Sequence, residues 1–139
     1  MVSEKASAIP SYPTYNEIRE FVAKDQTDKK TYIPGVYVCH NFSVDVIKNA
    51  YENNIHAGYV SLENNGTPIH AIVVFNTCDR GLIFLEPQMD VLFTRDKMNE
   101  MEEEGRYSIS VTYPDGSEEY FDFEFTDYSI NWNYLEEYG

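Results

Sequence analysis

Apolar residues recur at helical spacing in two segments of the N-terminal half of the chain. The first segment begins with a capping-box pair, Thr14 and Glu17, and ends near Asp25. The second follows a short β-branched and aromatic run, begins at Cys39 and ends near Asn53. Both segments are predicted to be helices, with apolar stripes made of Ile18, Phe21 and Val22 in the first and of Phe42, Val46, Ile47 and Ala50 in the second.

After these helices the pattern changes to short apolar runs typical of strands. The runs at residues 56–63 and 69–75 flank Asn65-Gly66, a dipeptide that favours the tight turn of a β-hairpin. A third run occupies residues 82–86. These segments predict three consecutive strands that pair in antiparallel fashion.

The C-terminal part repeats the alternation of helix and hairpin. Residues 95–104 favour a short exposed helix that ends at Gly105. Two alternating runs at residues 106–113 and 118–125 predict a second hairpin. The aromatic and acidic tail, residues 128–138, is expected to lie over the sheet.

This order of elements predicts an α+β fold. The helix that carries Cys39 is expected to pack on an antiparallel β-sheet, with the second hairpin added at the C-terminal end. The chain of 139 residues fits one domain over residues 1–139 and can bury about two-thirds of its unfolded surface. Residues 1–12 are polar and small, and we expect them to form a flexible lead.

The composition narrows the classes of partner. The formal net charge is −14, with 24 acidic against 10 basic residues, and contact with nucleic-acid phosphates or an anionic membrane needs a basic surface. We therefore expect neither a nucleic-acid partner nor membrane insertion. The N-terminus lacks the apolar core of a signal peptide, so we expect a soluble chain. A fragment of an exported or cell-surface protein would look the same, which leaves localisation open.

Cys39 stands where a nucleophilic thiol would be placed. The first turn of a helix has unpaired N–H groups and the positive end of the helix dipole, which favour the thiolate. Two other interpretations stay open: a small buried apolar residue, or a disulfide with Cys78, the other cysteine of the chain. The Cys and His residues do not show the spacings of metal sites, so no metal or other cofactor is expected.

His70 and Glu86 supply the partners that such a thiol needs. His70 lies near the start of one predicted strand and Glu86 at the end of the next, and antiparallel pairing would bring these two ends side by side. If the helix that begins at Cys39 meets the same edge, a nucleophile, a base and an orienting carboxylate converge. A single His in an apolar strand is otherwise a core or edge residue, and that alternative also stays open.

The same residues resemble the three sequence boxes of transglutaminase-like domains, whose fold is papain-like. The boxes are the run Tyr-Val-Cys39-His-Asn-Phe-Ser, the pair His70-Ala71, and Leu-Glu86-Pro-Gln. The resemblance covers roughly residues 14–90 and is strongest to small archaeal and bacterial members, which have an Asn-Thr-x-Asp-x-Gly turn like that at residues 76–81.

The resemblance implies Cys39 as nucleophile, His70 as general base and acid, and Glu86 as the group that orients His70. The backbone N–H of Cys39 would help to bind the oxyanion. The family has Asp where this chain has Glu86, and an aromatic residue where it has Ile72. A second oxyanion donor is not assigned by the sequence, which offers Tyr32, Tyr37 and Gln26.

Two functions follow from these observations. The first is cysteine-dependent acyl transfer on peptide or amide bonds, protease-like or transglutaminase-like, with a peptide or protein substrate. Of these two reactions, we expect hydrolysis rather than cross-linking. The alternative is a non-catalytic module that binds a peptide or glycan on the same scaffold. Its stacking surfaces would be the aromatic residues Tyr107, Tyr113, Tyr120, Tyr128, Trp132 and Tyr134. The oligomeric state is left open.

Overall fold

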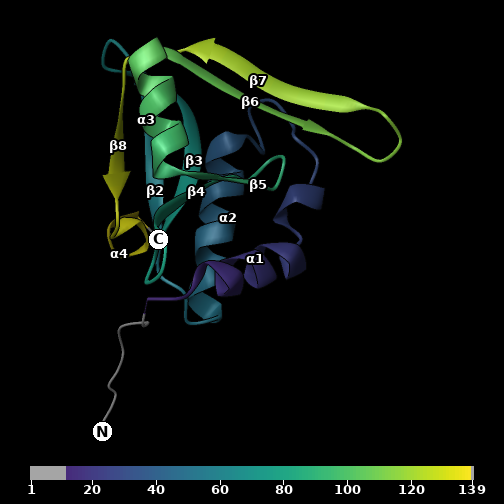
Figure 1. Cartoon of the computed structure of the whole chain (residues 1–139), viewed down its shortest axis with the longest axis vertical. Helices are drawn as coiled ribbons and strands as arrows, with labels where there is room; N and C mark the ends of the chain where they lie inside the picture. The colour runs from purple at the N-terminus through teal and green to yellow at the C-terminus, as the bar shows by residue number, and fades with distance from the viewer. Residues whose placement is uncertain (1–11, 139) are drawn as a thin grey trace, which may run out of the picture.

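The computed structural model describes residues 12–138, and Figure 1 shows its elements. The flexible lead predicted for residues 1–12 lies, except for residue 12, outside the described residues. The helices are α1 (Tyr15–Lys24), the short 3-10 helix η1 (Thr27–Lys29), α2 (Cys39–Glu52), α3 (Arg95–Glu104) and α4 (Tyr134–Tyr138). The strands are β2 (Ala57–Asn64), β3 (Thr67–Thr77), β4 (Gly81–Glu86), β5 (Val91–Thr94), β6 (Arg106–Thr112), β7 (Glu118–Glu124) and β8 (Asp127–Asn131).

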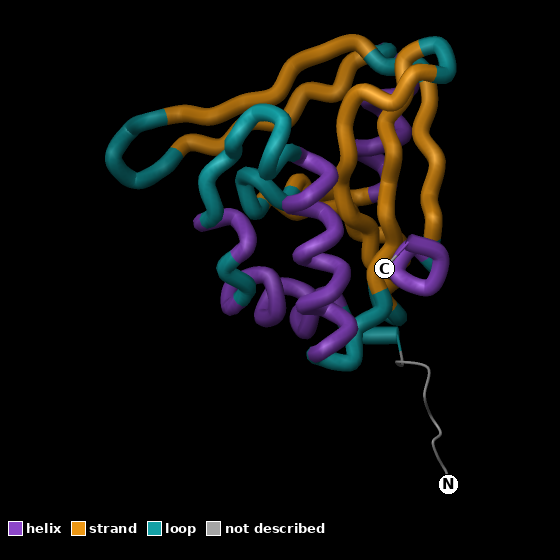
Figure 2. Tube along the Cα trace, turned by 180° about the vertical axis from the view of Figure 1, so that it is seen from behind, coloured by secondary structure: helices purple, strands orange, loops and turns teal. Residues whose placement is uncertain are grey.

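A five-stranded antiparallel sheet in the order β5-β4-β3-β2-β8 forms the middle of the molecule. Helices α1 and α2 cover one of its faces, which Figure 2 shows from behind. Helix α3 and the β6–β7 hairpin cover the other face. The fold is therefore α+β with a helix packed on an antiparallel sheet, as predicted.

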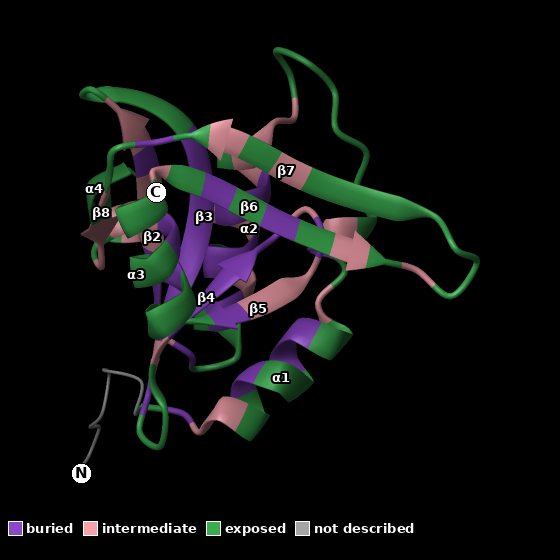
Figure 3. Ribbon diagram, turned by 45° about the horizontal axis from the view of Figure 1, so that its top comes forward, coloured by how far each residue is buried: buried purple, intermediate pink, exposed green. Residues whose placement is uncertain are grey.

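Strand β3 has apolar layers on both sides. Val73 and Phe75 pack with α1 and α2, whereas Ile72 and Val74 pack with α3 and β6. Because successive side chains of a strand point to opposite faces, a strand covered on both faces needs a continuous apolar run. This explains why Ala71 to Phe75 are all buried (Figure 3).

Local signals account for the element boundaries that position the site. The capping box at α1 is present: Thr14 Oγ1 accepts from Glu17 N at 3.1 Å, and Glu17 Oε1 accepts from Thr14 N at 2.8 Å. The turn between β2 and β3 has Asn65 and Gly66 at φ 52° and 85°, as the predicted tight hairpin turn requires. Helix α3 ends at Gly105, whose φ is 76°.

The C-terminal tail differs from its prediction. It does not lie over the sheet: β8 pairs with β2 as an edge strand, with Ile130 opposite Val60, and α4 follows it. The backbone N–H of Thr126 donates to Glu63 O at 2.8 Å and starts this pairing. Pairing covers the edge of β2, which would otherwise present unpaired backbone groups to solvent. The four-residue strand β5 was also not predicted.

Gly58 allows the tail to approach β2 closely. A Cβ atom at Gly58 would lie 2.9 Å from Val74 Cγ1, 3.0 Å from Trp132 Cε3 and 3.1 Å from Ile130 Cγ2. Side chains of β3, β8 and the residue after β8 therefore pack directly against the backbone at this position.

We expect Gly58→Ala to lower the free energy of unfolding by about 1–3 kcal/mol, because the added methyl overpacks this contact. Guanidinium denaturation measures the loss. In a Val74→Ala background, where the nearest atom is removed, the same substitution should be markedly less destabilising. Additive losses in the double variant would show that close packing at Val74 is not the cause.

Candidate active site

The structure brings the three predicted site residues together from three elements. Cys39 is the first residue of α2, His70 lies in β3 and Glu86 is the last residue of β4. Strands β3 and β4 pair in a register that places Val73 opposite Leu85, so the start of β3 lies beside the end of β4. His70 Nε2 and Glu86 Oε1 are 2.6 Å apart. The predicted juxtaposition of these two strand ends is confirmed.

Glu86 is a fully buried carboxylate, 0% exposed, whose two oxygens are both hydrogen-bonded. Oε1 accepts from the Tyr107 hydroxyl at 2.7 Å in addition to its contact with His70. Oε2 accepts from the backbone N–H of Gln88 at 3.3 Å. Because a buried charge is tolerated only when it is paired and hydrogen-bonded, these three groups hold Glu86 in place.

Tyr107 is a part of the site that the sequence reasoning missed. It lies in β6, is 0% exposed and joins the hairpin to Glu86. Its position in an alternating strand indicates only that one face is buried, and Glu86 lies 21 positions upstream. The sequence did carry one signal for this contact, a Tyr at an inward-facing position of the predicted strand. A buried Tyr hydroxyl needs a hydrogen-bond partner, so a polar group had to lie nearby.

The His70 ring is fixed by aromatic neighbours. Only 7% of His70 is exposed, and its ring centroid lies 5.5 Å from that of Tyr107, 5.1 Å from Phe121 and 5.4 Å from Phe123. Since Glu86 occupies Nε2, Nδ1 is the ring nitrogen left for the Cys39 sulfur. The packing and the carboxylate together set the orientation of the imidazole.

Cys39 and Cys78 both carry free thiols, so the alternative of a disulfide between them is excluded. Burial by itself raises the pKa of Cys39, but a hydrogen bond to the His70 side chain, the His70 charge and the backbone N–H groups of Ala71 and His40 outweigh it. The pKa of Cys39 is therefore lowered. A half-buried thiol with this environment is not a simple apolar core residue.

The pKa of His70 moves in the opposite direction. Burial lowers it, but hydrogen bonds to Cys39 and Glu86 and the charges of both groups raise the pKa to about 9. A lowered thiol pKa and a raised imidazole pKa favour a thiolate–imidazolium pair near neutral pH. The site thus places a thiol whose pKa is lowered beside an imidazole whose pKa is raised.

A cleft of about 610 Å³ opens beside this pair. Its lining is Tyr32, Cys39, Ile69, His70, Gln88, Met89, Glu118, Glu119, Tyr120, Phe121 and Phe123. Of the three candidates for a second oxyanion donor, Tyr32 alone belongs to this lining. The Tyr37 hydroxyl donates to Asp45, and Gln26 Nε2 donates to the backbone oxygen of Lys24.

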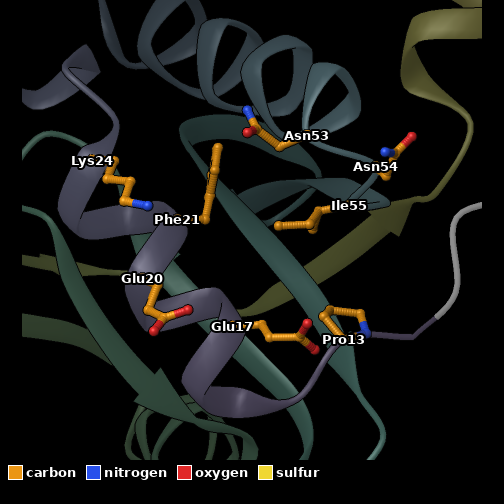
Figure 4. Close-up of a pocket in the computed structure, with 8 residues that line it drawn as sticks. All are labelled: Pro13, Glu17, Glu20, Phe21, Lys24, Asn53, Asn54 and Ile55. Atoms are coloured by element: carbon orange, nitrogen blue, oxygen red, sulfur yellow. The ribbon is translucent and has the colours of Figure 1, made fainter.

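A second hollow, of about 320 Å³, lies between α1 and the end of α2 (Figure 4). It is lined by Pro13, Glu17, Glu20, Phe21, Lys24, Asn53, Asn54 and Ile55. None of these residues is a Cys or His, and Glu17 is already used in the capping box of α1. The cleft beside Cys39 is therefore the better candidate for chemistry.

We expect Tyr107→Phe to lower the free energy of unfolding by about 1.5–3 kcal/mol, because the buried carboxylate loses a charge-assisted hydrogen bond. Urea denaturation measures it. Tyr120→Phe, on the same hairpin at a 70% exposed position, is the matched control and should change stability by less than about 0.5 kcal/mol. Equal effects of the two substitutions would contradict the role given to the Tyr107 hydroxyl.

Within residues 12–138 there is no cluster of three or more His, Cys, Asp or Glu side chains that could hold a metal ion. In the same part of the chain, every helix is too short or too polar to cross a membrane. Comparison with protein-family models, with curated proteins and with solved structures found no match for this chain.

Proposed function

We propose that this protein is a cysteine-dependent acyl-transfer enzyme that acts on peptide or other amide bonds. The observation that carries the proposal is the linked set of Cys39, His70 and Glu86 beside an open cleft. A thiolate at a helix N-terminus, an imidazole next to it and a buried carboxylate on the far ring nitrogen are the parts that such chemistry needs.

A transglutaminase-like domain with a cysteine-proteinase-like arrangement is part of this proposal. Its support is the order of the elements: the thiol opens a helix, the imidazole lies in a following strand and the carboxylate ends the next strand. Glu86 in place of the family's Asp is accommodated here, since its longer side chain reaches His70 Nε2 at 2.6 Å.

In the proposed reaction the Cys39 thiolate attacks the carbonyl carbon of the amide. The negative charge of the tetrahedral intermediate develops on the former carbonyl oxygen, near the backbone N–H groups that open α2. His70 then gives its proton to the leaving amine as the C–N bond breaks, which leaves a thioester on Cys39. His70 next accepts a proton from water as the water attacks the thioester, and the carboxylic acid and the thiolate are released.

Tyr32 is the second oxyanion donor in this proposal. It lines the cleft together with Cys39, and its ring is half exposed, so its hydroxyl can meet a substrate. Tyr37 and Gln26 are held by other partners. The Tyr32 hydroxyl and the backbone N–H of Cys39 would together supply two donors, the number that an oxyanion hole usually has.

The aromatic residues give little support to a stacking module. Tyr107 is buried and binds Glu86. Tyr134 stacks on Tyr59 with ring centroids 4.4 Å apart. Of the six residues considered for stacking, Tyr120 is the one with an exposed ring. These rings are therefore not gathered on one exposed face, and acyl transfer is the function that we favour.

We expect iodoacetamide to alkylate Cys39 with a pH midpoint below the ordinary thiol value of about 8.5, because the Cys39 pKa is lowered. The Cys78→Ser variant leaves Cys39 as the single thiol and is the background for the measurement. At neutral pH the rate should exceed that of a free thiol several-fold.

His70→Ala should raise this midpoint and slow alkylation at neutral pH, since the ion pair and hydrogen bond are lost. His40→Ala is the control, because the His40 ring is exposed and contacts Tyr59 and Tyr134. A rate equal to that of a free thiol, unchanged by His70→Ala, would remove the proposed enzyme function.

Tyr32→Phe should slow acylation of Cys39 by 4-nitrophenyl acetate at least about tenfold, because the oxyanion loses one donor. The released nitrophenolate reports the rate. Alkylation by iodoacetamide forms no oxyanion and should be unchanged in the same variant. An equal loss in both reactions would mean that Tyr32 shapes the cleft without binding the oxyanion.

A further inference from the structure

One edge of strand β7 is open to a further strand. Within the described residues 12–138, β7 pairs with β6 alone, and these two strands form a sheet separate from the five-stranded one. The hairpin extends beyond the body of the molecule in Figures 1 and 3. An open edge of this kind presents unpaired N–H and C=O groups to any extended chain that approaches it.

The register of the hairpin shows which backbone groups face outward. Hydrogen bonds join Tyr113 N to Ser117 O at 2.8 Å and Phe125 N to Gly105 O at 3.1 Å, one at each end of the hairpin. In an antiparallel pair, hydrogen-bonded and non-hydrogen-bonded positions alternate. The β7 residues whose backbone groups point away from β6 are therefore Glu118, Tyr120, Asp122 and Glu124.

Part of this open edge borders the cleft beside Cys39. Four consecutive residues, Glu118 to Phe121, line the cleft, so residues from both faces of the strand contribute and the strand presents its edge to it. Tyr32, from the loop before α2, lines the same cleft, and Figure 2 shows this loop next to the hairpin. The Phe121 ring meets the ring of His70. A chain laid along β7 would thus run toward the thiol.

Two acidic residues of β7, Glu118 and Glu119, line the cleft ahead of Phe121, the residue that meets His70. Glu119 is two residues before Phe121 on the same face of β7, which corresponds to about 7 Å along the strand. The Tyr113 hydroxyl donates to Glu119, and that hydrogen bond first, then burial and the charges of Glu119, Asp28 and Asp90, raise the pKa of Tyr113 to about 12. These acidic groups from η1, from the turn before β5 and from β7 therefore all act on the Tyr113 hydroxyl, which is bonded to Glu119 of the cleft lining.

Acidic groups also dominate around Asp90, the residue that follows Met89 of the cleft lining. Burial and then the charges of Asp28 and Asp25 raise the pKa of Asp90 to about 7, and Lys29 opposes this effect only in part. The exposed ring of Tyr120, on the same edge, is a face on which a cation can rest. A cationic side chain would be attracted to this end of the cleft, and an anionic one repelled.

We propose that the open edge of β7 binds an extended peptide with basic side chains, whose cations lie against Glu118 and Tyr120 on one face of the strand or against Glu119 on the other. The peptide backbone adds a strand to the hairpin through Glu118 and Tyr120. That the bound peptide delivers an amide to Cys39 rests on the proposed function, whereas binding itself does not. Basic peptides in extended conformation are therefore the substrate class.

The test uses a fluorescein-labelled Lys-Val-Lys-Val-Lys-Val amide and its counterpart with Glu in place of Lys. Fluorescence anisotropy measures binding to the Cys39→Ser variant, which cannot turn the peptide over. We expect the Lys peptide to bind at least about tenfold more tightly than the Glu peptide, with affinity that falls as salt is added. Equal affinities would overturn the proposal.

A matched pair of charge variants distinguishes attraction by the carboxylates of the cleft from attraction by the net negative charge of the whole protein. Glu118→Gln with Glu119→Gln should weaken binding of the Lys peptide at least about fivefold, since close charges attract most strongly. Glu103→Gln with Glu104→Gln changes the net charge equally at the exposed end of α3 and should have less than a twofold effect by the same principle. Equal losses in both double variants would show unspecific attraction and overturn the proposal.

Backbone pairing is tested on both partners. Tyr120→Pro removes an outward N–H that lies in the cleft lining, and it should weaken peptide binding more than Tyr120→Ala does. Asp122→Pro removes an outward N–H that lies outside the lining, and it should not weaken peptide binding. Lys-Val peptides that are N-methylated at either alternate set of residues need no protein variant. One set should abolish binding and the other preserve it, because only one edge of the peptide pairs.

The two proposals fail separately in these experiments. Tight, β7-dependent binding of the Lys peptide to a protein whose Cys39 is no more reactive than a free thiol would remove the enzyme function and leave the peptide site. A reactive Cys39 with equal binding of the Lys and Glu peptides, or with equal binding of both N-methylated sets, would leave the enzyme function and remove the peptide site.

Discussion

The need to satisfy one buried carboxylate organises this structure. Glu86 is 0% exposed, and a charge in that position is stable only with hydrogen-bond donors around it. The donors come from His70 in β3, from Tyr107 in β6 and from the backbone of Gln88. Because the β6–β7 hairpin has no strand pairing with the main sheet among the residues described, Tyr107 and the rings around it attach the hairpin to the body. Stability and site geometry therefore depend on the same contact.

The attached hairpin also creates the chemical environment of the thiol. Its rings at Phe121 and Phe123 cover His70, which excludes water from the imidazole and strengthens the interaction between His70 and Glu86. Helix α2 brings Cys39 to the other side of the imidazole, where backbone N–H groups favour the thiolate. Beyond His70, β7 continues as a wall of the cleft and carries its acidic residues there. One hairpin thus contributes an orienting group, a cover and a binding edge.

Short-range sequence patterns predict some elements of this fold and miss others. The helices at Tyr15–Lys24 and Cys39–Glu52 and the turn at Asn65-Gly66 follow from spacing, capping and backbone preference, which act over a few residues. Strand β8 was missed because it forms only where the edge of β2 is available, and that edge is about seventy positions upstream. Strand β5, only four residues long, carries too short a pattern to be distinguished from a loop.

The sequence by itself determined the α+β class, the acidic charge, the thiol at a helix N-terminus and the facing of His70 with Glu86, because each follows from local periodicity or from one antiparallel pairing. The tertiary structure alone decided that Tyr107 donates to Glu86, that Tyr32 rather than Tyr37 or Gln26 lines the cleft, and that β7 forms its wall. These contacts join segments that lie far apart in the chain. Packing of the hairpin on the sheet selects them, and no pattern within either segment encodes its partner.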